Sequence, residues 1–131
     1  LAGDGEPRIV DGDLQTIMAG LACGEPNILS WDILRNHVSA FVSCPDWVSA
    51  RGMRMLAAPM RGDPAVVSGE SGAVGMGVID ALMTDPAYGE LKEALGLGED
   101  SRVLLFSTEG NTDPENYRRI VWGGAYPTPE A

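Results

Sequence analysis

Residues 106–114 are Phe106-Ser107-Thr108-Glu109-Gly110-Asn111-Thr112-Asp113-Pro114, and the apolar run Val103-Leu104-Leu105-Phe106 leads directly into them. The apolar run predicts a strand over residues 102–106. Pro114 opens a predicted helix over residues 115–121, with Asn111 or Thr112 as its candidate cap. A strand that ends in a hydroxyl- and glycine-rich turn places side-chain oxygens and accessible backbone at the carboxyl edge of a sheet. Open α/β sheets bind their ligands at that edge.

Composition restricts the class of protein. The chain has 131 residues, enough for one domain with a hydrophobic core, and 44% of them are hydrophobic. The net charge of −10 argues against nucleic-acid and anionic-lipid partners, because both require clustered Lys and Arg. No apolar stretch approaches the ~20 residues that a membrane span needs, and no signal or transit peptide is visible.

The two cysteines, Cys23 and Cys44, are too few for a disulfide framework. With His37 as the single histidine, they cannot complete a tetrahedral zinc site, so no metal is expected. We expect two buried free thiols in a cytoplasmic protein, with one bridge between them as the alternative. His37, beside Asn36 on the polar side of a predicted helix, is expected to be solvated rather than to act as a base.

Apolar residues recur at helical spacing in several further stretches. The predicted helices cover residues 31–43 with Ser30 as N-cap, 47–57 after Pro45-Asp46, 71–83, and 87–95 closed by Gly96. Residues 13–21 are either a short helix or a strand-to-loop passage, Val66-Val67 is a short strand or linker, and the tail after residue 125 is irregular. Three glycines inside the helix 71–83 cost about 1 kcal/mol each relative to Ala. That helix therefore requires a very closely packed neighbour.

The pattern is mostly helical, with one strand. A single strand cannot form a sheet, because its backbone groups need partners on both sides. We therefore expect the rest of the sheet in sequence outside this chain, which begins at Leu1 rather than at a methionine.

A glycine-rich stretch opens the helix 71–83: Ser68-Gly69-Glu70-Ser71-Gly72-Ala73-Val74-Gly75-Met76-Gly77. Such a helix start can bind phosphate, but no Walker lysine follows and Glu70 would repel an anion. Close helix packing is the preferred interpretation. Ser107 and Thr108 either shape a turn or offer hydroxyls to a heterocyclic ligand, and residues 16–27 are either a pocket wall or a buried loop.

Three segments, in their order and approximate spacing, resemble the C-terminal half of the pyridoxal-phosphate enzymes of fold type II, the fold of the tryptophan-synthase β-subunit. In that group a Thr-Ile-Ala-Asp-Gly-like stretch, a Glu-Pro-x-Gly-Ala motif and a Ser-Gly-x-Asn or Ser-Gly-x-Gly-Asp turn line the cofactor site. The similar segments here are Thr16 to Leu21, Glu70 to Ala73 and Ser107 to Asn111. Within the group, the runs 18–26, 41–46, 68–73 and 107–114 resemble the diaminopropionate ammonia-lyases, so the similarity covers essentially the whole chain.

The resemblance implies an α/β fold with an open twisted sheet flanked by helices, of which residues 1–131 are a single, mostly helical C-terminal portion. It also implies pyridoxal 5'-phosphate as cofactor, an amino-acid substrate, and a homodimer for the full-length protein. Ser107 or Thr108 would face the pyridine nitrogen, with the alignment ambiguous by one residue. Glu70 would be a nearby hydrogen-bond acceptor, and Gly20 would let the backbone approach the ring.

The implied reaction is α,β-elimination of 2,3-diaminopropionate to pyruvate and ammonia. The Schiff-base lysine, the phosphate loop and the acidic bases are expected upstream, so no catalytic residue is assigned and the chain alone is expected to be inactive. Lys92, the single lysine, lies on a charged helix face and lacks the desolvation that a Schiff-base lysine needs. One alternative is a threonine or serine dehydratase of the same fold, although the turn Ser107-Thr108-Glu109-Gly110-Asn111 argues against it. Another is a non-catalytic module that acts through protein–protein contact.

Overall fold

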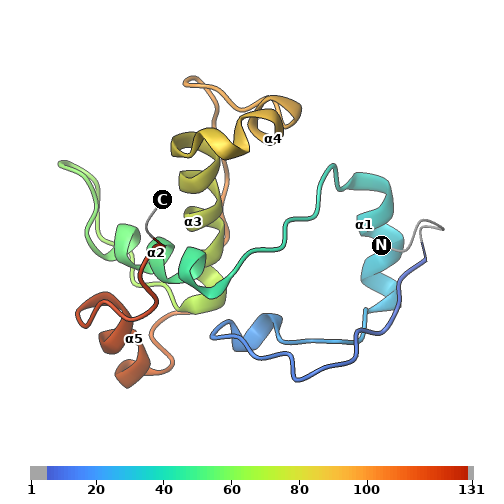
Figure 1. Ribbon diagram of the computed structural model, residues 1–131, viewed down its shortest axis with the longest axis horizontal. Helices are drawn as coiled ribbons and strands as arrows, with labels where there is room; N and C mark the ends of the chain where they lie inside the picture. The colour runs from blue at the N-terminus through green and yellow to red at the C-terminus, as the bar shows by residue number, and fades with distance from the viewer. Residues whose placement is uncertain (1–5, 130–131) are drawn as a thin grey trace. The chain divides into compact units, whose positions relative to one another are not determined.

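The computed structural model describes residues 6–129 and contains helices and irregular segments within that range. The chain forms two compact units, Leu1–Ser43 and Cys44–Ala131 (Figure 1). The first unit holds η1 (Ala19–Leu21) and α1 (Ile28–His37), and the second holds α2 (Asp46–Ala57), α3 (Glu70–Thr84), η2 (Pro86–Tyr88), α4 (Gly89–Ala94) and α5 (Pro114–Val121). The mostly helical character is confirmed, whereas membership of all residues in one catalytic domain stays a prediction. Among the described residues, no helix is both long and apolar enough to cross a membrane.

Helix α1 differs from its predicted bounds at both ends. Its N-cap is Asn27, whose side chain accepts a hydrogen bond from the backbone N–H of Ser30 at 3.0 Å, so Ser30 is capped rather than capping. The helix ends at His37, and Val38 is already extended. Phe41 nevertheless reaches Trp31, with ring centroids 6.2 Å apart, because the chain folds back after the helix. The prediction from apolar spacing therefore placed the C-terminal end of this helix six residues too far along the chain.

Helices α2 and α3 confirm the predicted helices 47–57 and 71–83 to within one residue at each end, and they pack directly on each other. Glycines make the contact possible. A Cβ on Gly77 would collide with the carbonyl of Val48, and a Cβ on Gly52 would collide with the carbonyl of Ala73. The neighbour that the glycine-rich helix requires is therefore α2. Fully buried Ala50 and Ala73 belong to the same core.

Capping residues set the end of α4 and the start of α5. Gly96, at φ +66°, terminates α4 with hydrogen bonds from its own N–H to Glu93 and from the N–H of Leu97 to Lys92, as in a Schellman motif. Helix α5 begins at Pro114, but its cap is Asp113, which accepts from the N–H of Asn116 at 3.0 Å. The prediction that Asn111 or Thr112 caps this helix was thus wrong, because the carboxylate of Asp113, directly before Pro114, caps it.

The predicted strand 102–106 is not a strand in the described residues, and neither is Val66-Val67. A strand is defined by repeated backbone pairing with a neighbouring segment, and within the described range these residues show no such ladder; Val66 makes a single backbone bond, from its N–H to the carbonyl of Leu56 at 2.9 Å. Their side chains stay uncovered: Leu104 is 77% and Phe106 75% exposed. Residues 13–21 contribute the single 3-10 turn η1 and no α-helix.

We expect Gly77→Ala to destabilise the protein by about 1–3 kcal/mol, because the added methyl group must displace the backbone of α2. Gly75→Ala is the matched control on the same helix, since its Cβ would meet the movable side chain of Leu105 at 3.2 Å. The control should leave the free energy of unfolding unchanged or raise it by up to about 1 kcal/mol, because Ala has a higher helix propensity than Gly. Urea unfolding of both variants checks this, and equal midpoints would show that the contact with Val48 is not tight.

Candidate cofactor site

The start of α3 and the turn 107–110 lie against each other within the second unit. The N–H of Gly69 donates to the carbonyl of Glu109 at 3.1 Å. A Cβ on Gly69 would lie 2.7 Å from the carbonyl oxygen of Gly110, and a Cβ on Gly72 would lie 3.1 Å from the nitrogen of Thr108. A Cβ on Gly69 would collide with the turn and one on Gly72 would force it to shift, so these two glycines allow the two segments to approach as closely as they do.

A carboxylate of the chain itself fills the N-terminus of α3. Gly69, the N-cap residue, has no side chain with which to cap the helix, and Glu109 Oε1 accepts a hydrogen bond from the N–H of Ser71 at 2.6 Å. A negative charge at this end of a helix is favoured by the free N–H groups and the helix dipole. The geometry supports the packing interpretation of the glycine-rich stretch rather than phosphate binding at this helix start.

Two hydroxyls meet beside this helix start. Ser107 Oγ donates to Ser68 Oγ at 2.8 Å, and Ser68 is only 1% exposed. Ser107 and Thr108 are both exposed, but the Ser107 hydroxyl is bonded to buried Ser68, whereas Thr108 approaches Gly72 through its backbone. Ser68 was missed from the sequence because a serine among glycines looks like an ordinary turn residue.

Glu70 is a buried carboxylate, 7% exposed, in the first turn of α3. Its backbone carbonyl accepts from Ser49 Oγ at 2.5 Å, and its carboxylate accepts from Asn116 Nδ2 at 2.5 Å. A buried polar group without a hydrogen-bond partner costs free energy, so the bond from Asn116 helps to hold the Glu70 side chain in this place. Asn116 on α5 was also missed, because an asparagine near a helix start looks like a solvated residue.

The structure thus brings Glu70, Ser107 and Thr108 together. Gly20 lies in the middle of η1, in the other unit, and is exposed. Lys92 is in the last turn of α4 and half-buried, and His37 is exposed at the end of α1, as expected. Within residues 6–129, no group of three or more His, Cys, Asp or Glu side chains is arranged to hold a metal.

Both cysteines are free, as expected, but they differ in environment. Cys23 is exposed, so the expectation that both thiols are buried is wrong for it, whereas Cys44 is half-buried. Burial, followed by the negative charge of Asp46, raises the pKa of the Cys44 thiol above its ordinary value of 9.0.

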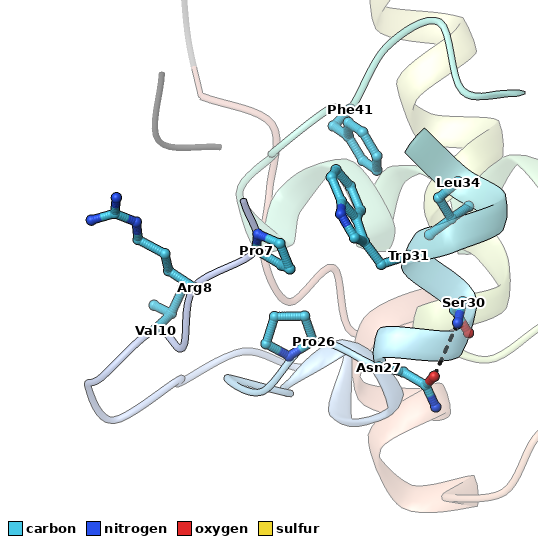
Figure 2. Close-up of a pocket in the computed structure, with 9 residues that line it drawn as sticks. All are labelled: Pro7, Arg8, Val10, Pro26, Asn27, Ser30, Trp31, Leu34 and Phe41. Carbon is cyan, nitrogen blue, oxygen red and sulfur yellow. Dashed lines mark hydrogen bonds between the residues drawn. The ribbon is translucent and has the colours of Figure 1, made fainter. Parts of the chain in front are cut away.

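A hollow of about 430 Å³ lies within the first unit, and none of the predicted cofactor residues lines it. Figure 2 shows the rings of Trp31, Phe41 and the two prolines around it, while the guanidinium of Arg8 extends away. The side chain of Asn27 is engaged with the N–H of Ser30. The hollow is therefore apolar with few converging polar groups; its lining residues are Pro7, Arg8, Val10, Pro26, Asn27, Ser30, Trp31, Leu34 and Phe41.

Comparison with known proteins gives consistent relatives, although no family model matches. The chain is 55% identical over 117 residues to diaminopropionate ammonia-lyase of Escherichia coli K12. It is 52% identical over 122 residues to that of Salmonella typhimurium. The chain resembles a segment of diaminopropionate ammonia-lyase. The matches cover 89% and 92% of this chain but span only 29% and 30% of the length of the relatives.

Solved structures of diaminopropionate ammonia-lyase from E. coli agree in fold. The structure with an aminoacrylate-PLP azomethine reaction intermediate matches with a TM-score of 0.81 at 55% identity, covering 85% of this chain and 29% of that one. The complex with D-serine matches with a TM-score of 0.78 at 53% identity, covering 82% and 28%. The predicted fold class is confirmed at this level: the chain has the structure of a segment of that lyase.

We expect Glu109→Ala to lower the free energy of unfolding by about 1–2 kcal/mol, because the N–H of Ser71 loses its charged acceptor. Glu99→Ala, an exposed turn residue, is the control and should change it by less than about 0.5 kcal/mol. Chemical denaturation of the two variants provides the measurement. If Glu109→Ala lowered the free energy of unfolding by no more than Glu99→Ala does, the cap would contribute nothing to stability.

Iodoacetamide should alkylate Cys23 faster than Cys44, because the thiolate is the reactive form and the raised pKa of Cys44 keeps its thiol protonated. The rate at Cys44 should continue to increase above pH 9.0. Peptide mass spectrometry over a time course measures both sites, with Cys44→Ser as the assignment control. A Cys44 rate that stops increasing below pH 9.0 would contradict the raised pKa.

Proposed function

We propose that this chain is the C-terminal portion of a pyridoxal-phosphate-dependent ammonia-lyase of fold type II that converts 2,3-diaminopropionate to pyruvate and ammonia. The observation that carries the proposal is the 55% identity to the E. coli lyase over 89% of this chain, together with the matching backbone. The complete protein would be a cytoplasmic homodimer that takes part in amino-acid catabolism. The chain alone would be inactive, with the lysine and acidic bases supplied upstream.

The chemistry of the residues beside α3 is compatible with a pyridoxal-phosphate ring. Ser107 and Ser68 form a neutral hydroxyl pair, and no cationic or anionic side chain is hydrogen-bonded to either serine among the described contacts. A neutral hydroxyl from Ser107 or Thr108 would meet the pyridine nitrogen without holding a proton on it, unlike a carboxylate. Glu70 would be a nearby acceptor, and Gly20 would admit the ring close to the backbone.

Pyridoxal phosphate, when bound, supplies the electron withdrawal that makes the Cα proton of an amino acid removable. The residues of this chain would orient the ring and leave its nitrogen unprotonated. A ring without that proton withdraws electrons less strongly, which favours prompt loss of the β-ammonia over long-lived carbanion chemistry. Elimination followed by hydrolysis consumes one water and releases two ammonia molecules for each pyruvate.

The test is to express the complete gene product that contains this chain and to incubate it with 2,3-diaminopropionate, serine and threonine. We expect pyruvate and ammonia from 2,3-diaminopropionate in a one-to-two ratio, whereas dehydration of serine would give one-to-one. Faster turnover of serine or threonine would favour the dehydratase alternative, for which the D-serine complex of the E. coli relative is the supporting observation.

The chain 1–131 expressed alone is the matched control and should release no pyruvate. If the complete product neither absorbs as a pyridoxal-phosphate protein nor turns over any of the three amino acids, the lyase proposal fails. The non-catalytic alternative would then take its place.

A further inference from the structure

We propose that Asn116 is a positioning residue that, together with Arg119, holds the carboxylate of Glu70 in one orientation beside the cofactor site. This inference rests on the proposed function, since it takes Glu70 as part of a pyridoxal-phosphate site. Asn116 and Arg119 lie on α5, forty-six and forty-nine residues further along the chain than Glu70, and the resemblance assigned neither of them a role.

The first step is the bond between Asn116 and Glu70. Asn116 Nδ2 lies 2.5 Å from Glu70 Oε1, and Glu70 is 7% exposed. A carboxylate shielded from water is stabilised chiefly by the donors that reach it, and hydrogen bonds to an ionised group are short and strong. The amide of Asn116 is the side-chain donor described for this carboxylate.

Arg119 decides which way the amide of Asn116 faces. The guanidinium of Arg119 donates twice to Asn116 Oδ1, at 2.7 Å from Nη2 and 3.2 Å from Nε. An arginine has donors and no acceptor, so it must face the oxygen of the amide. The NH₂ group of Asn116 is thereby directed at Glu70. The positive charge of Arg119 also polarises the Asn116 amide and so strengthens its hydrogen bond to Glu70, without direct contact between Arg119 and Glu70.

Arg119 is itself held by the C-terminal segment. Its guanidinium lies over the ring of Tyr126, 5.4 Å from the centroid, and donates to Tyr126 Oη at 3.2 Å. Tyr126 has φ +55°, a conformation that a non-glycine residue keeps only where its surroundings impose it. Arg54 on α2 imposes it by donating to the carbonyls of Ala125 at 3.0 Å and Tyr126 at 3.2 Å.

The result is a continuous series of contacts from the C-terminal segment to the first turn of α3. Each member is hydrogen-bonded to the next, and these bonds favour one orientation of the Glu70 carboxylate. Glu70 lies in the same helix turn that contacts residues 107–110, where the hydroxyls proposed for the pyridine nitrogen are found. A shift of Glu70 would therefore alter the surroundings of the ring and not only the stability of α5.

The experiment uses the complete protein loaded with pyridoxal phosphate and compares Asn116→Asp, Arg119→Gln and Arg118→Gln. Asn116→Asp places an acceptor against Glu70, and Arg119→Gln removes the charged clamp. Arg118→Gln, one residue away on the same helix and exposed, is the matched control with the same charge change. The readouts are the absorbance spectrum of the bound cofactor, the cofactor dissociation constant, kcat and KM.

We expect Asn116→Asp to change the cofactor spectrum and to lower kcat on the order of 100-fold, as expected when a site group is displaced. Arg119→Gln should act in the same direction to a smaller extent, and Arg118→Gln should leave all four readouts as in the unmodified protein. Should both network variants match Arg118→Gln in all four readouts, the inference is overturned while the proposed function stands. A parent protein that binds no pyridoxal phosphate would overturn the proposed function instead.

A fourth variant separates positioning from folding. Glu70→Gln combined with Asn116→Asp restores a hydrogen bond between the two positions with donor and acceptor exchanged. We expect it to recover the melting temperature lost in Asn116→Asp but not the cofactor spectrum, because the charge has moved to the other side chain. Recovery of both would show that the bond is structural alone, which contradicts the inference.

Discussion

The interaction on which the rest of the second unit depends is the capping of α3 by Glu109. Helix α3 begins at a glycine that has no side chain to satisfy the first free N–H groups, and the carboxylate arrives from a turn 38 residues later in the chain. That long-range bond fixes the turn 107–110 on α3, so that Ser107 reaches Ser68 and α5 starts where Asn116 can reach Glu70. The bond that caps α3 therefore also positions the residues of the candidate site.

Close packing of α2 on α3 supports that constraint from the other side. Glycines at the contact cost helix propensity, but they let the two backbones meet where any side chain would separate them. The contact places Ser49 beneath the first turn of α3, where its hydroxyl holds the carbonyl of Glu70. Glu70 is therefore fixed at both ends, through its backbone by α2 and through its carboxylate by α5.

The sequence predicted the elements that carry strong local signals and missed those that depend on distant partners. Pro114, Gly96 and the periodicity of α2 and α3 located their helices because caps and apolar faces are encoded within a few residues. The prediction of a strand over residues 102–106 was wrong, because a strand forms only where a neighbouring segment pairs with its backbone, and a local apolar run does not encode that neighbour. Ser107, Thr108 and Glu70 were identified through motif resemblance, whereas Ser68, Glu109 and Asn116 act through contacts 38 to 46 residues apart that no short pattern records.

Two carboxylates, those of Glu109 and Glu70, belong to the segments that carry the neutral hydroxyl pair of Ser68 and Ser107, and both are hydrogen-bonded elsewhere. Glu109 is turned to the helix N-terminus, where the dipole stabilises it, and Glu70 is turned to an amide that Arg119 polarises. Each carboxylate thus has its own donor and has no need of the hydroxyl of Ser107. The Ser68–Ser107 pair therefore has no charged side chain as a hydrogen-bond partner among the described contacts. A chain with a net charge of −10 can therefore keep a neutral hydroxyl pair beside the first turn of α3, because the two nearby carboxylates are hydrogen-bonded elsewhere.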